Sequence, residues 1–320
     1  MSEINFYSGE LCPSFYSDEL NQLYYIKTEK EGCFVYRIDL AQNKAESVFK
    51  QKSADSDISI GSNEICFRHV YYSTLSGEIG PHRYFTTSIY KNGRLNWKPR
   101  SGIQVYYRQK EVESYYFVND KLFMTYEPTG GDRTEIPYQS SLFVIDQNTT
   151  RKVCEADNAI FVQCSTGFLL WPSDQIAIPD NVLFYDGKNE TLIAVPEKIE
   201  HIDWSNFIAY DSVLYYSSDN QVLRFNENTK EKELIKEVTS TPHLCFSDGV
   251  LYIYDCDDKK VYVYDPVFKC IEKEYDIPRE TIPKYGVSAF FENKLVVSER
   301  NGLFSYDLGL GIIEEIQIIK

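Results

Sequence analysis

Short runs of apolar and aromatic residues recur along the chain at nearly constant spacing. Each run ends in an acidic or amide residue of the kind that favours a turn. Five of these residues are separated by 40, 40, 39 and 42 positions: Asp146, Asp186, Asn226, Asp265 and Asp307. An earlier copy ends at Asp39, and a looser copy, aligned on Tyr90, lies 51 residues further on. The pattern predicts seven successive copies of one structural unit.

Every unit contains more than one predicted strand. A second run with paired aromatic or aliphatic residues precedes the first, at 23–25, 70–72, 122–124, 168–170, 213–216, 250–253 and 295–297. Still earlier runs, such as 160–162 and 244–246, precede these, and the two sets are joined by tight links, such as Asn119-Asp120, that are typical of hairpins. A more polar run, such as 232–236, follows the turn residue. Four antiparallel strands per repeat are typical of a propeller blade.

The repeat accounts for nearly the whole chain. Seven blades of about 45 residues each use almost all of the 320 residues, so we predict one domain over residues 1–320. The predicted fold class is all-β, a seven-bladed β-propeller of four-stranded antiparallel blades. A composition of 26 Tyr and 19 Phe with only 2 Met agrees with strands rather than long helices. Residues 312–319 can supply the last blade's outer strand, and residues 4–7 can pair with it or lie elsewhere, so the sequence leaves open how the ring closes.

The predicted units resemble the later half of kelch-type repeats. The segment Val261-Tyr262-Val263-Tyr264-Asp265-Pro266 is similar to the third kelch strand, which ends in Tyr-Asp-Pro. The second strand lacks the kelch diglycine and reads, for example, Tyr216-Ser217 at that place. The resemblance implies a divergent kelch-like propeller, and such a fold implies protein recognition more often than catalysis.

Composition also bounds where the protein works. No stretch approaches the roughly 18 consecutive apolar residues of a membrane helix, and residues 1–10 lack the features of a signal peptide. The eight cysteines are widely spaced and include no CxxC pair, which argues against a disulfide framework. We therefore expect an intracellular protein, cytoplasmic or nuclear, with no membrane segment. The sequence leaves the oligomeric state open.

The predicted connections between second and third strands differ in length. They are long in blades two and three, at 73–83 and 127–140, intermediate in blade four at 172–179, and short in later blades. Loops held side by side on a rigid scaffold commonly carry recognition. We therefore predict a partner-binding face on blades two and three, to which the loops contribute His82, Arg133 and Tyr138. The alternative is that the long loops are tolerated surface insertions.

A basic and aromatic segment lies beside these loops. Residues 79–110 contain seven Lys or Arg and no Asp or Glu, so the rest of a chain with net charge −15 sums to −22. Arginine and aromatic residues are enriched at interfaces, and arginine suits an acidic or phosphorylated partner segment. The predicted contact residues are Tyr84, Arg94, Trp97, Arg100 and Arg108. The alternative is that strand alternation divides these charges between two faces. Nucleic acid is not an expected partner, because the isoelectric point of about 4.8 implies repulsion of polyanions.

The sequence contains no recognisable catalytic constellation. Its four histidines are scattered without metal-ligand spacing, and no GxSxG, HExxH or P-loop motif occurs. The segment Asp255-Cys256-Asp257-Asp258 lacks the glycine and glutamate of a calcium loop, which makes it a solvated turn. We therefore predict a non-enzymatic protein-interaction scaffold with no cofactor and no metal. The alternatives are an enzyme or small-ligand binder with a pocket at the propeller axis, and a structural subunit with a permanently buried apolar face.

Overall fold

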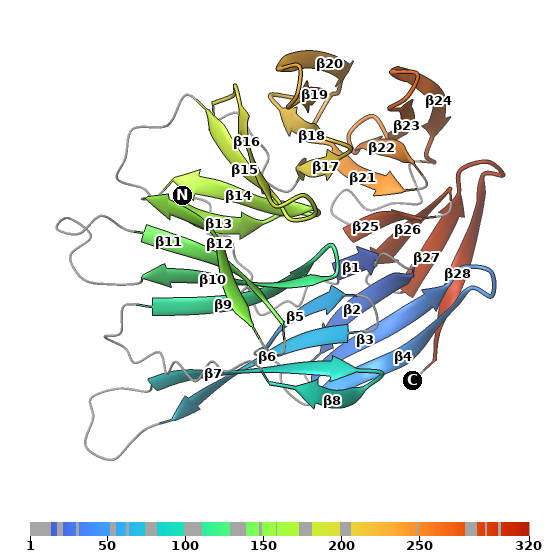
Figure 1. Ribbon diagram of the computed structural model, residues 1–320. Helices are drawn as coiled ribbons and strands as arrows, with labels where there is room; N and C mark the ends of the chain where they lie inside the picture. The colour runs from blue at the N-terminus through green and yellow to red at the C-terminus, as the bar shows by residue number, and fades with distance from the viewer. Residues whose placement is uncertain are drawn as a thin grey trace. The chain divides into compact units, whose positions relative to one another are not determined.

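The structure, a computed structural model, describes most of the chain as β-strands (Figure 1). The described residues are 14–17, 22–29, 32–51, 56–61, 64–73, 82–98, 111–128, 139–146, 149–157, 159–172, 181–198, 206–247, 249–278, 287–291, 293–299 and 302–319. These residues contain 28 strands. In these ranges no helix has the length and apolar character needed to cross a membrane.

The predicted four-strand repeat is confirmed, and its seven copies fall into two compact units. Unit 1 contains the first and last copies, and unit 2 contains the five copies between them. In every copy, consecutive strands pair in antiparallel fashion in chain order. That one domain covers residues 1–320 stays a prediction.

Unit 1 is built on a single eight-stranded sheet. Its strands are β1 (Ser14–Ser17), β2 (Leu23–Glu29), β3 (Gly32–Asp39), β4 (Lys44–Gln51), β25 (Val287–Phe291), β26 (Lys294–Glu299), β27 (Gly302–Asp307) and β28 (Ile312–Ile319). The fourth strands of the two copies, β4 and β28, pair in parallel, with Gln317 opposite Lys44 and Ile319 opposite Glu46. The prediction that residues 312–319 form the last fourth strand is therefore confirmed, but the pairing with β4 was not predicted. Residues 4–7 lie outside the described residues.

Unit 2 contains five separate four-stranded sheets. The first two comprise β5 (Ser56–Gly61), β6 (Glu64–Ser73), β7 (His82–Lys91) and β8 (Arg94–Trp97), then β9 (Glu111–Val118), β10 (Lys121–Pro128), β11 (Gln139–Ile145) and β12 (Thr150–Asp157). The third comprises β13 (Ala159–Gln163), β14 (Gly167–Pro172), β15 (Val182–Asp186) and β16 (Thr191–Val195). The last two comprise β17 (Ile208–Tyr210), β18 (Val213–Ser218), β19 (Gln221–Asn226) and β20 (Glu231–Glu237), then β21 (His243–Ser247), β22 (Val250–Asp255), β23 (Lys260–Asp265) and β24 (Cys270–Asp276).

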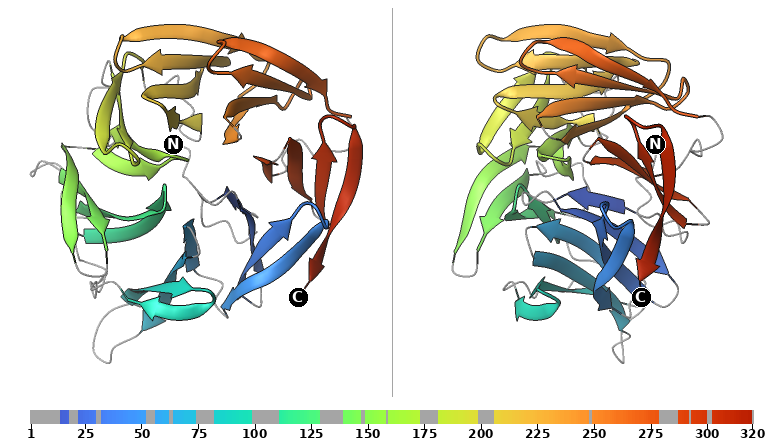
Figure 2. Two further views of the ribbon diagram at one scale, coloured as in Figure 1. Left: turned by 45° about the vertical axis from the view of Figure 1, so that its right-hand side comes forward. Right: turned by 90° about the vertical axis from the view of Figure 1, so that its right-hand side faces the viewer.

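The hydrophobic core of unit 2 lies between consecutive sheets, each of which lies next to its chain neighbour (Figure 2). Between the second and third sheets, the rings of Phe123 and Phe168 pack edge to face at 5.2 Å. Between the third and fourth, Phe184 stacks on Phe207 at 5.7 Å. Large aromatic side chains therefore supply much of the buried area, as the composition indicated.

Polar side chains add bonds between the same neighbouring sheets. Ser59 Oγ accepts a hydrogen bond from the Phe117 N–H at 2.6 Å, and Thr166 Oγ1 accepts one from the Ala209 N–H at 2.6 Å. The buried Asn206 amide donates to Ser217 Oγ and to the Pro242 carbonyl, and it accepts from the Leu244 N–H at 3.1 Å. These bonds satisfy backbone groups that lie where one sheet meets the next, and so avoid the cost of burying them unpaired.

The residue that ends each third strand explains the spacing found in the sequence. Asp186 Oδ1 accepts hydrogen bonds from the N–H groups of Lys188 and Asn189, at 2.8 and 3.3 Å. Asn226, Asp265 and Asp307 accept the equivalent pair of bonds in their own turns. The last turn residue then adopts a left-handed φ: Glu190 (56°), Lys230 (59°), Lys269 (54°) and Gly311 (69°). One side-chain-capped turn is thus repeated along the chain.

Candidate partner-binding surface

Each sheet has two ends of different construction. The turn end, as we name it, carries the short capped turns between third and fourth strands, and the loop end carries the connections between second and third strands. At the loop end, eight residues separate β6 from β7, and ten separate β10 from β11. Only Asp219 and Asn220 separate β18 from β19. The long connections predicted for blades two and three are therefore present, although residues 74–81 and 129–138 themselves lie outside the described residues. The connection of blade four, predicted to be intermediate, is also long, because nine residues separate β14 from β15.

The predicted contact residues on β7 and β8 do not gather at one end. Ser73 pairs with His82 at the loop end of β7, and Tyr84 lies two positions further along that strand. Arg94 pairs with Lys91 at the turn end. Nine residue steps separate His82 from Lys91, which corresponds to about 30 Å along a strand. The structure thus places Arg94 at the opposite end of the sheet from His82.

Trp97 and Arg94 also differ in burial. Arg94 is exposed on the four-residue strand β8. Trp97 is partly buried and packs against the core cluster that contains Cys66, Ile89 and Phe117. Part of the indole therefore stabilises the core between the first two sheets of unit 2.

Part of the basic segment has an acidic partner. Glu64 of β6 lies 4.0 Å from the Lys91 ammonium and accepts a hydrogen bond from the Asn96 side chain at 3.0 Å. Local pairing therefore reduces the positive charge at the turn end of this sheet.

Four of the predicted contact residues, Arg100, Arg108, Arg133 and Tyr138, lie outside the described residues. Their places in the chain are nevertheless bounded by described strands. Residues 99–110 leave β8 after its loop end and enter β9 at its loop end, so Arg100 and Arg108 belong to a connection between two loop ends. Arg133 and Tyr138 belong to the connection between β10 and β11.

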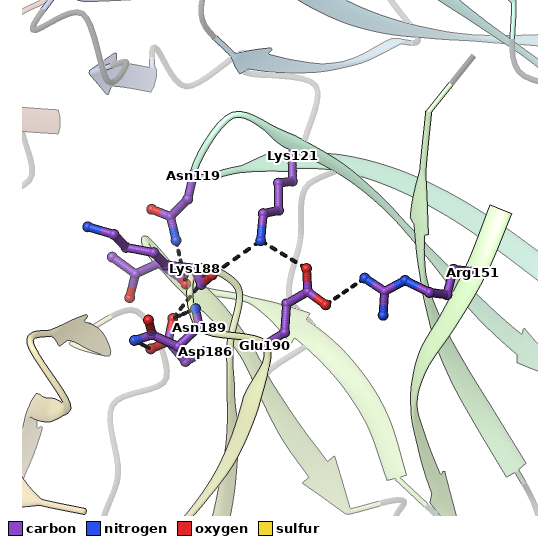
Figure 3. Close-up of polar contacts among 8 residues, drawn as sticks. Asn119, Lys121, Arg151, Asp186, Lys188, Asn189 and Glu190 are labelled. Atoms are coloured by element: carbon purple, nitrogen blue, oxygen red, sulfur yellow. Dashed lines mark hydrogen bonds and ion pairs between the residues drawn. The ribbon is translucent and has the colours of Figure 1, made fainter. Parts of the chain in front are cut away.

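A polar network that the sequence did not predict occupies the turn end between the second and third sheets of unit 2 (Figure 3). The Glu190 carboxylate accepts from Lys121 Nζ at 2.9 Å and from Arg151 Nη2 at 2.6 Å. Lys121 also donates to the Lys188 carbonyl, and Asn119 donates to the Thr166 carbonyl at 3.1 Å. Two cations from one sheet thus bind a carboxylate from the next. The only sequence signal is the regular position of Glu190 as the last residue of a capped turn.

Close approach of the backbones allows this contact. Gly187 begins the turn, and a Cβ atom there would lie 2.9 Å from a methyl carbon of Val118 and 3.2 Å from the Thr166 carbonyl oxygen. A larger residue would therefore push the turn away from the neighbouring sheet.

The network shifts the ionisation of its members. The Arg151 hydrogen bond, reinforced by Lys121, lowers the pKa of the Glu190 carboxyl group below its usual range. Desolvation by burial, followed by the nearby Glu190 charge, raises the pKa of the Tyr185 phenol. Burial likewise raises the pKa of the Cys154 thiol. Glu190 therefore stays ionised, whereas Tyr185 and Cys154 stay protonated, which is typical of a structural ion-pair network rather than of an activated nucleophile.

The segment that partly resembles a calcium loop is built as a turn, but the prediction that it is solvated is wrong for its first residue, because Asp255 is 1% exposed and held by hydrogen bonds. The Asp255 carboxylate is buried and accepts bonds from the Thr239 N–H at 2.7 Å, Thr239 Oγ1 at 2.8 Å and Ser240 Oγ at 3.2 Å. These bonds attach the turn 256–259 to the connection between β20 and β21. Within the part of the chain that the structure describes, no three His, Cys, Asp or Glu side chains lie together as a metal site requires.

Comparison with known proteins identifies the fold. No protein-family model matches the sequence, and no curated protein does. A solved structure of Hsv2 from Kluyveromyces lactis, a β-propeller, matches 96% of this chain and 98% of its own with a TM-score of 0.54 at 9% identity. AztD from Citrobacter koseri matches 95% of this chain and 86% of its own with a TM-score of 0.50 at 10% identity.

The chain has a β-propeller fold. With its seven four-stranded antiparallel groups it is a seven-bladed member of that all-β class, as the repeat predicted. At such low identity the comparison shows the fold alone.

Proposed function

We propose that the protein is a non-enzymatic interaction scaffold that binds a partner through the loop end of blades two and three. These blades are the sheets β5–β8 and β9–β12. The observation that carries the proposal is the contrast between connections of eight and ten residues there and a connection of two residues in the sheet β17–β20. The adjacent sheet β13–β16 shares the long connection, with nine residues between β14 and β15. Variable loops on a rigid β-scaffold are a frequent basis for recognition. The propeller fold and the resemblance to kelch repeats support a binding role in the same way.

The partner segment is acidic or phosphorylated. Residues 79–110 contain no acidic residue, and Arg100, Arg108 and Lys110 belong to the connection 99–110 from β8 to β9. His82 is the first residue of β7, at its loop end, and Tyr84 lies two positions further along the strand. Arg133 and Tyr138 belong to the connection between β10 and β11. Arginine binds carboxylate and phosphate oxygens in bidentate fashion, and aromatic residues supply buried contact area.

Reversal of arginine charges tests this proposal: one variant changes the connection 99–110, and a control variant changes β8 at the turn end. The probe is a panel of fluorescent peptides with clustered aspartate and phosphoserine, whose binding is measured by anisotropy at fixed salt. We expect Arg100→Glu combined with Arg108→Glu to weaken binding at least tenfold, which corresponds to about 1.4 kcal/mol.

The matched control is Arg94→Glu, an exposed reversal at the opposite end of the same sheet. It should change the affinity less than twofold per charge reversed. Equal losses for the two variants would show a general charge effect and contradict the proposed surface. Binding that the double reversal leaves unchanged, at unchanged unfolding midpoint, would also contradict it.

A pocket at the propeller axis, used by an enzyme or a small-ligand binder, is the alternative function. Two or more close carboxylates, or a histidine cluster, lining such a pocket would favour it over the loop end.

A further inference from the structure

The fourth strand of the sheet β13–β16 differs in chemistry from the other fourth strands. β16 reads Thr-Leu-Ile-Ala-Val and carries no charged side chain. Each of the other six described fourth strands carries at least one: β4, β8, β12, β20, β24 and β28. Charged side chains on an edge strand oppose pairing with a further strand. β16 lacks that protection.

The outer edge of β16 is the edge of its sheet in the part of the chain that the structure describes. β16 pairs with β15 on one side, and none of the described strands pairs with its other side. Ile193 and Val195 point into the core, whereas Leu192 is 45% exposed and Ala194 is exposed. An edge strand of this kind presents unpaired backbone groups together with apolar side chains.

The exposed side chains of β16 lie beside apolar side chains of β15, of which Tyr185 is buried. Ala194 lies opposite Leu183, and Leu192 lies opposite Tyr185, on the same face of the sheet. Leu183 is partly buried and packs against the cluster to which Val153 and Cys154 of β12 also belong. A strand added to β16 would therefore meet apolar side chains at alternate positions, which is how strand addition gains specificity.

The Thr191 end of this edge follows Glu190 in the chain, and Glu190 lies beside the two cations of Figure 3. Glu190, the residue before β16, is bound by both Lys121 and Arg151, so two positive charges meet one carboxylate. The Arg151 side chain is 59% exposed, and its guanidinium uses one nitrogen for Glu190. An acidic residue at this end of an added strand would find a guanidinium with remaining donors.

Unit 1 shows that a fourth strand of this chain accepts another strand, even where both strands carry charged side chains, as β4 and β28 do. β28 adds to the edge of β4 in parallel over three residue pairs. The backbone N–H of Gln317 also donates to the Asn43 carbonyl at 2.8 Å.

We propose that β16 binds an extended segment of another protein by strand addition. The segment carries alternating apolar side chains that lie against Leu192 and Ala194, and an acidic residue at the Thr191 end. A second copy of this chain is a less suitable occupant, because two chains of net charge −15 repel each other. The site is separate from the loop end of blades two and three and does not rest on the function proposed there.

Two peptides test the proposal directly. In each, valine and threonine alternate over eight positions, and one aspartate stands either first or last, so that a parallel or an antiparallel strand places it near Arg151. We expect at least one of them to bind the full-length protein saturably by fluorescence anisotropy, and to slow amide hydrogen exchange of residues 191–195. Failure of both peptides to bind would overturn the proposal.

Matched variants separate the edge from general surface effects. Leu192→Lys with Ala194→Lys places charges at two exposed positions of β16 and should weaken binding at least tenfold. Leu234→Lys changes a leucine that is 51% exposed on the charged strand β20 and should change binding less than twofold. Equal binding by wild type and the β16 variant would overturn the proposal.

The acidic position has its own control. Arg151→Gln should weaken binding of the aspartate peptide several-fold. It should leave unchanged the binding of a peptide with asparagine in that position. Self-association of the wild type that Leu192→Lys with Ala194→Lys abolishes would assign the edge to a second copy, and so would contradict a foreign segment.

Discussion

The turn end and the loop end of the sheets follow different rules. At the turn end, Asp186, Asn226, Asp265 and Asp307 each accept the same pair of backbone hydrogen bonds, and a left-handed residue closes the turn. At the loop end, the connections vary from two to ten residues. The turn end is therefore specified by what the fold needs, whereas the connections at the loop end vary in length from sheet to sheet. A stability measurement should detect substitutions at the turn end, and a binding measurement should detect substitutions at the loop end.

The largest effect on stability is expected from Asp186→Ala. Asp186 is 2% exposed, and its carboxylate accepts bonds from the Lys188 and Asn189 N–H groups and from the Asn189 side chain at 2.8 Å. Its removal leaves these donors without their acceptor, at a cost of about 2–3 kcal/mol in the free energy of unfolding. Urea denaturation followed by circular dichroism measures this difference.

The equivalent change at Asp146 gives the comparison. The Asp146 side chain accepts from the N–H and the hydroxyl of Thr149 and is exposed, so Asp146→Ala should cost about 1 kcal/mol. A larger loss at Asp146 than at Asp186 would contradict burial as the reason for the difference.

Insertions compare the two ends directly. Gly-Ser inserted between Lys188 and Asn189 interrupts a capped turn and should lower the free energy of unfolding by about 2 kcal/mol. The same insertion between Gly130 and Gly131 lengthens a connection that is already long, and should cost no more than about 0.6 kcal/mol. If the two insertions had equal effects on the midpoint of urea unfolding, the distinction between the ends would fail.

A small effect is also expected for the pH dependence of the Glu190 network. Because Arg151 and Lys121 lower the pKa of Glu190 in the folded state, the ionised carboxylate stabilises the fold above the unfolded value, near 4.5. That contribution is lost as the pH falls through the lower, folded-state pKa. It should be no more than about 1 kcal/mol, because Arg151 is largely exposed.

Glu190→Gln makes this effect measurable. The difference in unfolding free energy between wild type and Glu190→Gln should be greatest near pH 6 and shrink on acidification toward pH 3. A difference that grows on acidification would reverse the assigned direction of the shift.

The sequence predicts the order of the strands well, because each blade repeats one hydrophobic pattern and one capped turn. It predicts contacts between distant segments poorly. The parallel pairing of Gln317 with Lys44 joins residues 273 positions apart, and nothing in the pattern of either strand specifies it. The Glu190 network likewise depends on close approach of Gly187 to the next sheet, which a periodic pattern does not contain.

The predicted site shows the same limit. Residues 79–110 form one basic segment in sequence, yet the ten-residue strand β7 carries the chain from the loop end to the turn end within it. Arg94 is therefore separated from His82, although the two lie only twelve positions apart in sequence. The aromatic residues of this segment are also not all surface residues, because Trp97 is partly buried and packs against the core.

The central claim is that the loop end of blades two and three binds the partner, and shortening both long connections tests it most directly. Ser73 and His82 are paired, so a two-residue Asn-Gly turn can replace residues 74–81, and a second such turn can replace residues 129–138. Calorimetric titration with the tightest phosphoserine peptide should then show a loss of binding of at least tenfold, with the far-ultraviolet spectrum and the unfolding midpoint unchanged. Wild-type affinity in the shortened protein would contradict the claim.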